Sequence, residues 1–440
     1  MRSDENITKA VSELLNRWLN AGFTPSQNIG AMLYVMCLKK MIDENACMNP
    51  AYMGIILEIT KIIYRPTSFE DIETLRKGAE VIEEAYSLER GLLNNVLNPS
   101  RYQEEHWKKT FLGVVALISE MENYGDIAEY LMYKISSEKG NEKVSSYTVA
   151  RLLKIAANVK DGESVLDGTV GYGFSAIESI KGKDVNFCGV DINVEAIQNT
   201  AMYLILSNNH KFTLMTEDFT SINTAGLHDK VIMDIPFGLK ANELMGFQTV
   251  RVKNWMNDVA CKEMECLFIA EGLDSLKDTG RMVAVVPQGF LFKQSKALTI
   301  IRENIVKKGM LKAVVTLPSV YNYTTINTTM LVLEKGNEDI LFVDASKLIQ
   351  RERRNEPVFT EENQGLLEDI LENKKVIEDI SFTVQKDDVL SIGDWSIARY
   401  KKTENVTTYR VVSEINRDLE ECYSRLAGLH DANNKLSLFQ

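Results

Sequence analysis

The sequence predicts an α/β protein with a mostly parallel, doubly wound sheet, an N-terminal helical domain and a C-terminal helical tail. Two observations predict this class. From about residue 144, short apolar segments of strand length alternate with helical segments, the pattern that builds parallel sheets. Before residue 140, apolar residues recur at helical spacing without strand alternation. We therefore expect a helical domain at 1–140, an α/β domain at 141–350 and an extension at 351–440.

The N-terminal domain is expected to contain several amphipathic helices. One face of the first helix carries Ile7, Val11, Leu14, Leu15, Trp18 and Leu19. A second helix is expected near Ile29–Met41. Ser68 with Asp71 resembles a capping box that opens a long helix toward Leu92, and another helix is expected over Phe111–Lys134. This composition favours a structural or partner-docking domain over a catalytic one.

The α/β region is expected to supply seven strands and three main helices. The predicted strands are Ser164–Leu166, Asn186–Val190, Phe212–Met215, Val231–Met233, Met282–Val286, Ala313–Leu317 and Thr329–Leu333. The predicted helices are Ser175–Ser179, Val194–Asn208 and Val259–Leu276, the last closed by Asp278-Thr279-Gly280 as a C-cap. Ligands of such sheets bind at the carboxyl ends of the strands. Functional residues are therefore sought there.

The last part of the chain is polar and ends in a short heptad-like run. Its apolar positions are spaced 3, 4, 3, 4 and 3 residues apart: Val412, Ile415, Leu419, Cys422, Leu426 and Leu429. Fewer than three heptads are short for an independent coiled coil. The run predicts a terminal amphipathic helix, which either packs on its own protein or docks a partner.

Composition and charge exclude several classes of protein. No apolar run approaches the roughly 20 residues that cross a bilayer, so we expect no membrane association. The six cysteines are scattered without a CxxC pair, which makes a disulfide framework or a metal site unlikely and favours a reducing cytoplasm. The net charge is −12, whereas a protein that binds DNA alone usually has a basic face. If DNA is the substrate, another subunit should supply much of the phosphate contact.

A glycine-rich turn follows the first predicted strand, in the segment Val165-Leu166-Asp167-Gly168-Thr169-Val170-Gly171-Tyr172-Gly173. Glycine permits unusual φ values and lets a ligand approach the backbone closely. Gly171 and Gly173, with Ala176, also satisfy the dinucleotide fingerprint. Asp191, at the end of the next strand, is placed to accept hydrogen bonds from ribose hydroxyls. The turn alone therefore leaves a nicotinamide cofactor and S-adenosylmethionine both open.

Two further features favour S-adenosylmethionine. Asp167 lies on the strand just before the turn, where it suits the ammonium of an amino acid directly or through water. A dinucleotide has no such group. After the third strand, Glu217-Asp218-Phe219 offers an acceptor for the adenine amino group and an apolar wall. The cofactor-binding residues expected from the sequence therefore include Asp167, Gly168, Thr169, Gly171, Gly173, Asp191, Asp218 and Phe219.

A second junction, Asp234-Ile235-Pro236-Phe237, follows the buried strand Val231–Met233. An exocyclic base amine is a poor nucleophile because its lone pair is delocalised into the ring. Acceptors on its N–H bonds return electron density to nitrogen and align it with a methyl donor. The Asp234 carboxylate and the Ile235 carbonyl are the natural acceptors, and Phe237 can stack on a base that has left the duplex. This junction therefore predicts methyl transfer to a base amine.

In their order, these elements resemble the methylation (M) subunit of type I restriction–modification systems, an N6-adenine DNA methyltransferase family. The resemblance covers roughly residues 140–400. Its segments are Lys143–Leu153, the DGTVGYG turn, Gly189–Asn193, Glu217-Asp218, DIPF, Gly280–Phe292, Ile301-Arg302, Val315–Pro318, Leu331–Lys335, Phe342–Ser346 and Trp395–Tyr400. Such a long colinear match is more specific than any single motif.

The resemblance implies a Rossmann-like methyltransferase domain that transfers a methyl group from S-adenosylmethionine to adenine N6 in DNA. It implies that Ser145 and Ser146 cover the cofactor and that Ile192 lies beside it. In that family the helical N-terminal domain helps to enclose DNA, and a separate DNA-specificity subunit reads the sequence and binds the M subunit. A hetero-oligomer is therefore expected, and the sequence leaves a restriction (nuclease) subunit open.

The chain departs from the family's pattern at several pocket positions. Asp234 replaces Asn and keeps an acceptor, whereas Ile235 replaces a proline and loses its fixed φ. Gly168 also stands where the family has proline, and Ser145-Ser146 stands for Thr-Pro. These changes loosen the pocket. The alternatives are therefore a weakened or inactive scaffold of the same fold, and an RNA or protein methyltransferase.

Overall fold

The computed structural model describes residues 5–97, 105–138, 144–239, 254–257, 259, 261–321, 324, 326–350, 357–401 and 412–436. The chain forms two compact units, Met1–Arg399 and Tyr400–Gln440. The helices and the sheet up to Arg399 therefore pack as one body, and the sequence-based boundaries near 140 and 350 stay a prediction. Among the described residues, every helix is too short or too polar to span a lipid bilayer.

A nine-stranded sheet organises the first unit, in the order β3-β2-β1-β4-β5-β7-β6-β8-β9. The strands are β1 (Ser164–Asp167), β2 (Asn186–Asp191), β3 (Phe212–Thr216), β4 (His228–Asp234), β5 (Leu276–Pro287), β6 (Leu311–Thr316), β7 (Thr328–Glu334), β8 (Asp339–Asp344) and β9 (Ser381–Gln385). Neighbours from β3 to β5 are parallel, whereas β7 and β9 run antiparallel to their neighbours. The chain leaves β1 in one direction and returns to β4 on its other side, which creates a topological switch point between them.

All seven predicted strands form, and two further strands complete the sheet. β8 and β9 extend it beyond the predicted set. Asp278-Thr279-Gly280 was predicted as a helical C-cap, and this prediction is wrong: α11 (Met264–Ser275) ends at Ser275 and β5 begins at Leu276. The pairing of β4 with β5 shifts register here. A Cβ on Gly280 would lie 3.1 Å from the carbonyl oxygens of His228 and Asp229, so this glycine permits close strand approach.

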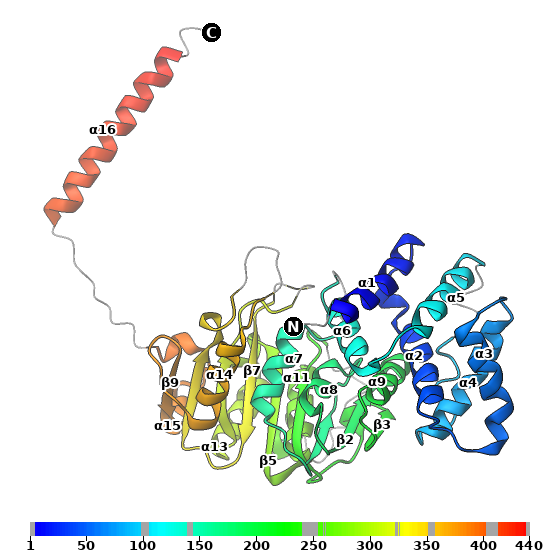
Figure 1. Ribbon diagram of the computed structural model, residues 1–440. Helices are drawn as coiled ribbons and strands as arrows, with labels where there is room; N and C mark the ends of the chain where they lie inside the picture. Colours follow the sequence, from blue (N-terminus) through cyan, green and yellow to red (C-terminus); the bar gives the residue numbers. More distant parts are fainter. Residues whose placement is uncertain are drawn as a thin grey trace. The chain divides into compact units, whose positions relative to one another are not determined.

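Helices cover both faces of the sheet, as a doubly wound fold requires (Figure 1). They are α7 (Tyr147–Ala157), α8 (Phe174–Ile180), α9 (Val194–Leu206), α11, α12 (Gly289–Phe292), α13 (Lys296–Lys307), α14 (Glu361–Asn373) and α15 (Lys386–Ile392). Side-chain caps start several of them: Ser146 accepts from Val149 N–H on α7 and Asn193 from Glu195 N–H on α9. The expected helix from Val259 begins instead at Met264, five residues later.

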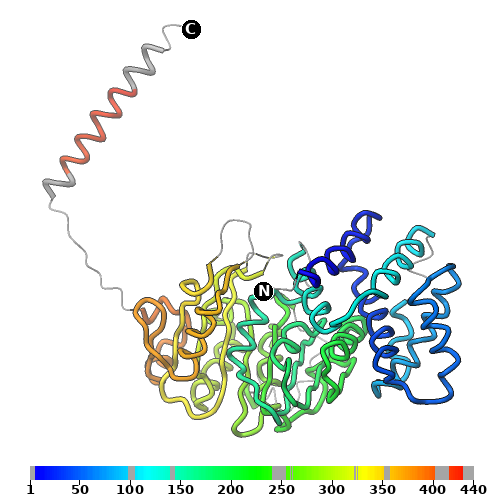
Figure 2. Tube along the Cα trace, viewed as in Figure 1, coloured from blue at the N-terminus to red at the C-terminus, as the bar shows by residue number. Residues whose placement is uncertain are grey.

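The described N-terminal residues, 5–97 and 105–138, form six α-helices: α1 (Glu5–Asn20), α2 (Ile29–Asp43), α3 (Met53–Tyr64), α4 (Asp71–Ala85), α5 (Glu105–Ser119) and α6 (Tyr124–Ser136). α2 is buried along nearly its whole length and packs on α9, which joins the helices to the sheet (Figures 1 and 2). The apolar face of α1 buries Val11, Leu14 and Trp18, but Leu19 is 55% exposed.

Two sequence-based boundaries in this region are wrong. The segment Phe111–Lys134 is divided between α5 and α6, because Asn123 adopts a left-handed conformation with φ 58° between them. The helix expected to reach Leu92 ends at Ala85. At its start the Asp71 carboxylate accepts from the backbone N–H groups of Thr67 and Ser68, at 2.6 and 2.9 Å, so half of the expected capping box forms.

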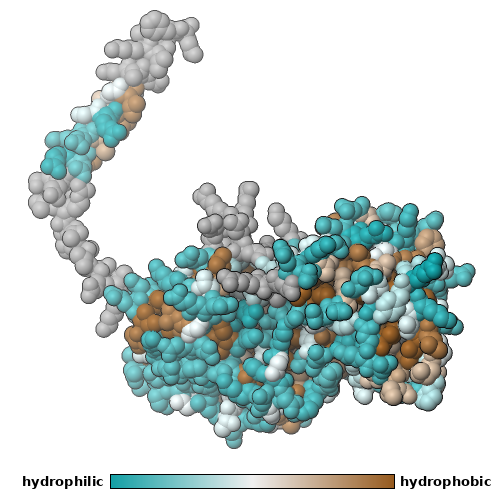
Figure 3. Space-filling model, in the orientation of Figure 1, coloured by the Kyte–Doolittle hydropathy of each residue, from teal (hydrophilic) through white to brown (hydrophobic). Residues whose placement is uncertain are grey.

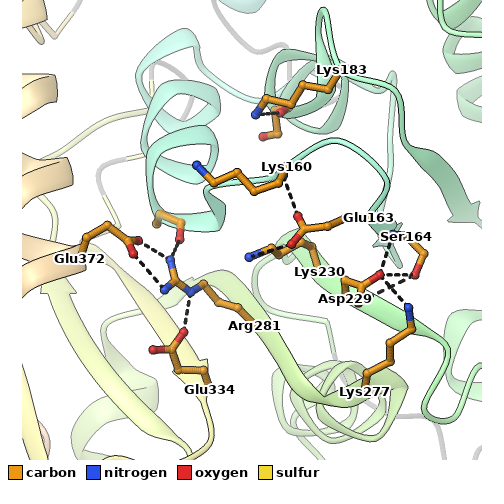
Figure 4. A network of polar contacts seen from close by, with 12 residues as sticks. Lys160, Glu163, Ser164, Lys183, Asp229, Lys230, Lys277, Arg281, Glu334 and Glu372 are labelled. Atoms are coloured by element: carbon orange, nitrogen blue, oxygen red, sulfur yellow. Dashed lines mark hydrogen bonds and ion pairs between the residues drawn. The ribbon is translucent and has the colours of Figure 1, made fainter.

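A polar network ties the strands together near the starts of β1 and β4 (Figure 4). The Arg281 guanidinium on β5 pairs with Glu334 on β7 and Glu372 on α14, and it donates to the Ala156 carbonyl at the end of α7. The face of this unit seen in Figure 3 is mostly hydrophilic, with apolar areas near the β9 end of the sheet and over the N-terminal helices. There α3 exposes Met53, Leu57 and Tyr64.

In the part of the second unit that the structure describes, residues 412–436 form the helix α16 (Val412–Leu436). It includes the whole heptad-like run, so the predicted terminal helix is confirmed. Leu419, Leu426 and Leu429 are exposed. Whether the helix packs on its own protein or docks a partner stays a prediction.

Candidate active site

A cavity of about 330 Å³ lies at the carboxyl ends of β1, β2 and β4. Eleven of the residues predicted from the sequence line it: Ser145, Gly168, Thr169, Gly171, Asp191, Ile192, Asp218, Phe219, Asp234, Ile235 and Pro236. A larger cavity of about 760 Å³ adjoins it beside α2 and α9 and shares Asn193 and Glu217 with it. Since that larger cavity touches neither β1 nor β4, we assign the candidate site to the smaller one.

Asp167 stands directly behind the turn that forms one wall of the cavity. Only 2% of it is exposed, and its Oδ1 accepts from the Thr169 backbone N–H at 2.9 Å. Burial, together with the neighbouring carboxylates of Asp234 and Asp191, raises its pKa to about 8, while the Thr169 hydrogen bond acts to lower it. Three acidic side chains from three strands therefore converge where a cation would be favoured.

The glycine turn has the close packing that its sequence implied. A Cβ on Gly168 would lie 2.6 Å from the Phe219 ring, so the ring takes the space beside this glycine. Gly171 and Gly173 have φ of 51° and 79°, which glycine adopts without strain. Gly173 lies outside the cavity lining at the start of α8, where it fits against Ile177 and Thr200.

Asp191 is held firmly at the end of β2. Its Oδ2 accepts from the Gly171 N–H and its Oδ1 from the Asn193 N–H, both at 2.9 Å. These bonds fix the carboxylate on the cavity wall, and each oxygen has a second lone pair to offer a ligand. Ile192 follows it and is exposed.

An aromatic wall closes the side of the cavity next to Gly168. Phe219 is buried, and its ring stacks on Phe268 of α11 with centroids 6.3 Å apart and planes 5° apart. Asp218 caps the short helix at Phe219–Ser221, since its Oδ1 accepts from the backbone and hydroxyl groups of Thr220 at 2.9 and 2.8 Å. A flat apolar surface therefore lies beside a carboxylate.

At the other end of the cavity, Asp234 is anchored by side chains from distant segments. Its Oδ1 accepts from the Tyr321 hydroxyl at 2.5 Å, and its backbone carbonyl accepts from the Thr169 hydroxyl at 3.4 Å. Burial raises the pKa of Asp234, whereas hydrogen bonds from Tyr321 and Ser145 lower it. Ser145 thus reaches Asp234 as well as the cavity.

The rest of the DIPF segment is arranged around this carboxylate. Ile235 is buried and its N–H donates to the Val285 carbonyl at 3.3 Å, while Pro236 is exposed. Phe237 is half-buried outside the cavity lining, and its ring meets Tyr321 edge to face at 5.2 Å and 85°. It is therefore neither locked in the core nor fully in solvent.

The structure also adds residues that the sequence argument missed. Met264 and Phe268 of α11 line the cavity, and Tyr321 touches Asp234 and Phe237. α11 is buried on nearly all sides, so its sequence pattern did not single out the residues that face the cavity. Tyr321 follows a strand whose carboxyl end is on the same edge of the sheet, and that position was the available signal. Ser146 lies outside the lining as the N-cap of α7.

The chain is similar to known proteins in sequence and in structure. The methylase subunit of the type I restriction enzyme MpnII from Mycoplasma pneumoniae is 25% identical over 336 residues, which cover 69% of this chain and 61% of that protein. The chain thus spans about three fifths of the length of this relative. A type I restriction–modification methyltransferase subunit from Streptococcus thermophilus has a TM-score of 0.75 at 18% identity, covering 90% of this chain and 99% of that one.

A solved chain of another type I R-M system has a TM-score of 0.69 at 15% identity and covers 99% of both chains. These likenesses show a shared fold. The sequence model of the N-6 DNA methylase family matches residues 119–408, a range that includes both junctions and every strand of the sheet. The chain therefore belongs to the N-6 DNA methylase family.

Proposed function

We propose that this chain transfers a methyl group from S-adenosylmethionine to the N6 amine of adenine in DNA, as the modification subunit of a type I-like restriction–modification complex. The observation that carries this proposal is that Asp191 and Asp234, from two junctions 43 residues apart in the numbering, line one cavity. Membership of the N-6 DNA methylase family supports the same reaction.

The cofactor end of the cavity suits S-adenosylmethionine. Asp191 would accept the ribose hydroxyls, Phe219 would cover the adenine, and Asp218 or Glu217 would accept its amino group. Asp167 would balance the ammonium directly or through water, and Ser145, which lines the cavity, would cover the cofactor. S-adenosylmethionine, when bound, supplies an electrophilic methyl group on a sulfonium. This donor set matches a cation with a ribose better than it matches a dinucleotide.

The substrate end suits an exocyclic amine. The Asp234 carboxylate and the Ile235 carbonyl would accept its two hydrogens, returning electron density to nitrogen and orienting it toward the methyl group. Phe237 and Pro236 would contact the base face after the base leaves the duplex. The cavity between Asp191 and Asp234 is formed in the free protein, which supports a working site over an inactive scaffold.

The net charge of the chain indicates which partners it needs. At a net charge of −12, the chain has no general attraction for phosphate. We propose that a DNA-specificity subunit supplies sequence reading and much of the backbone contact, in a hetero-oligomer that also admits a restriction (nuclease) subunit. All six cysteines are free, which fits a cytoplasmic location.

The test is methyl transfer by the complex purified with its native partners. Radiolabelled S-adenosylmethionine is incubated with DNA, RNA and protein substrates, and the modified adenines are mapped. We expect label in DNA adenine N6, lost in an Asp234→Ala complex that still binds the cofactor by calorimetry. Label confined to RNA or protein, or unchanged turnover in Asp234→Ala, would contradict the proposal. No calorimetric heat with the parent complex would instead support the inactive scaffold.

A further inference from the structure

Tyr321 contacts both Asp234 and Phe237, the first and last residues of the DIPF segment. It lies 87 residues beyond Asp234 and follows β6, whose carboxyl end faces the same edge of the sheet as that of β4. Its hydroxyl donates to Asp234 Oδ1 at 2.5 Å, and its ring meets Phe237 at 5.2 Å. Only 1% of Tyr321 is exposed, so its ring is fixed by packing.

The segment that Tyr321 holds has little rigidity of its own. Ile235 does not fix φ as a proline would. Asp234 ends β4 in register with Val285 of β5, and past the strand end the Ile235 N–H donates to the Val285 carbonyl at 3.3 Å. The carboxylate accepts from Tyr321 and Ser145, and the 2.5 Å bond from the Tyr321 hydroxyl is a short contact that fixes where Oδ1 points.

We propose that Tyr321 is a positioning residue for methyl transfer: its hydroxyl fixes Oδ1 of Asp234 so that Oδ2 faces the amine, and its ring sets the orientation of Phe237. The inference rests on the proposed function, because it deepens the role of the same site. It explains how a segment without the first proline keeps a defined geometry.

Several ionisable groups surround the carboxylate. Asp167 faces it from β1, Asp191 lies beside Asp167 at the end of β2, and Tyr321 approaches from the segment after β6. Ser145 adds a neutral hydrogen bond. Tyr321 lowers the pKa of Asp234, so its removal raises that pKa and moves the loss of ionised Asp234 to higher pH.

The test is Tyr321→Phe in the complete complex, which removes the hydroxyl and keeps the ring. We expect kcat at pH 7 to fall roughly tenfold, the size of a lost charge-assisted hydrogen bond. The acidic limb of the pH profile of kcat should move to higher pH, while the cofactor Kd stays within about twofold, as for a residue that acts on orientation rather than cofactor binding. A purely structural role would change stability without moving this limb.

Two further variants make the result decisive. Tyr34→Phe removes another buried hydroxyl, which donates to the Leu75 carbonyl at 2.8 Å in the helical part, and should leave kcat and its pH profile unchanged. In an Asp234→Asn background, where residue 234 no longer titrates, Tyr321→Phe should produce no shift of the acidic limb. The same shift in that background would assign the limb to Asp167 and overturn the inference.

The outcomes also separate this inference from the proposed function. A parent complex that methylates no nucleic acid refutes the proposed function and with it the role of Tyr321. A parent complex that methylates DNA adenine, with Tyr321→Phe indistinguishable from it in kcat and pH profile, refutes the inference alone.

Discussion

Asp167 illustrates how burial changes the chemistry of a single residue in this site. With a pKa of about 8, its carboxyl group is mostly protonated at pH 7 in the free protein. A cationic ligand beside it favours the ionised form and lowers that pKa, so binding releases a proton below about pH 8. In the proposed binding mode, affinity for the cofactor is linked to pH through this residue.

We predict that the affinity for S-adenosylmethionine rises with pH between about 6 and 8 and levels off above, by at most about tenfold per unit. Calorimetry in buffers of different ionisation enthalpy measures the proton released. Asp167→Asn should remove this dependence and separates the proton of Asp167 from that of the cofactor's own amine. Equal pH dependence in parent and variant would show that Asp167 does not titrate on binding.

Asp191 should contribute the largest single share of cofactor affinity. Its two backbone hydrogen bonds orient the carboxylate before the ligand arrives. Asp191→Ala removes a charge-assisted acceptor, which is worth about 1.5–3 kcal/mol, and should raise the cofactor Kd by roughly tenfold or more. A Kd within twofold of the parent, in a variant of unchanged melting temperature, would exclude this residue from ribose binding.

A substitution at Gly168 tests how tightly the aromatic wall beside it is packed. A methyl group there would lie 2.6 Å from the Phe219 ring, which is itself stacked on Phe268. We predict that Gly168→Ala weakens cofactor binding about tenfold and lowers the free energy of unfolding by about 1–3 kcal/mol, the usual effect of overpacking.

The matched control is Gly365→Ala in α14, where an added Cβ meets nothing within 4 Å. It should stabilise the helix by about 0.5–1 kcal/mol and leave the cofactor Kd unchanged. Chemical denaturation and calorimetry measure both variants. Unaltered binding in Gly168→Ala would mean that the Phe219 ring can move without consequence.

At the scale of elements, Arg281 ties β5 to β7, α7 and α14 (Figure 4). Glu334 is also paired with Lys312 at 2.9 Å, whereas Glu372 depends more on Arg281. We predict that Arg281→Met lowers the free energy of unfolding by about 3–5 kcal/mol, because it leaves partly buried carboxylates without their cation.

Adding Glu372→Gln to Arg281→Met should recover part of that loss, since it removes one uncompensated charge. Arg281 lies four residues before Val285, the residue that pairs with Asp234, so the cofactor Kd should be unchanged in both variants. Urea denaturation gives the free energies. A loss below about 1 kcal/mol would place this network among weak surface ion pairs.

At the scale of the whole molecule, net charge bears on the proposed contact with DNA. The chain has 62 acidic and 50 basic residues, which gives its net charge of −12. We predict that the isolated chain binds duplex DNA weakly and that the complex with its specificity subunit binds with a steep salt dependence. Titrations of chain and complex at several salt concentrations measure the two slopes. A steep slope for the isolated chain would move the phosphate contacts onto this subunit.

The sequence by itself determined seven of the nine strands and both junctions of the site. Strands such as β1, β2 and β4 are short apolar runs, because a parallel strand covered on both faces buries every side chain, and this pattern is local. Asp191 and Asp234 could be placed at strand ends for the same reason. The C-cap prediction at Gly280 was wrong because a glycine suits both a helix C-cap and a close approach of two strands. Only the partner strand distinguishes the two.

Only the tertiary structure decided which side chains meet. Strand order is set by packing over the whole sheet, where β7 inserts antiparallel between β5 and β6. That order brings Tyr321 to Asp234 across 87 residues and sets Phe219 against Gly168. Periodicity records whether a residue is buried, but it carries no information about the neighbour it is buried against, and the chemistry of this site depends on those neighbours.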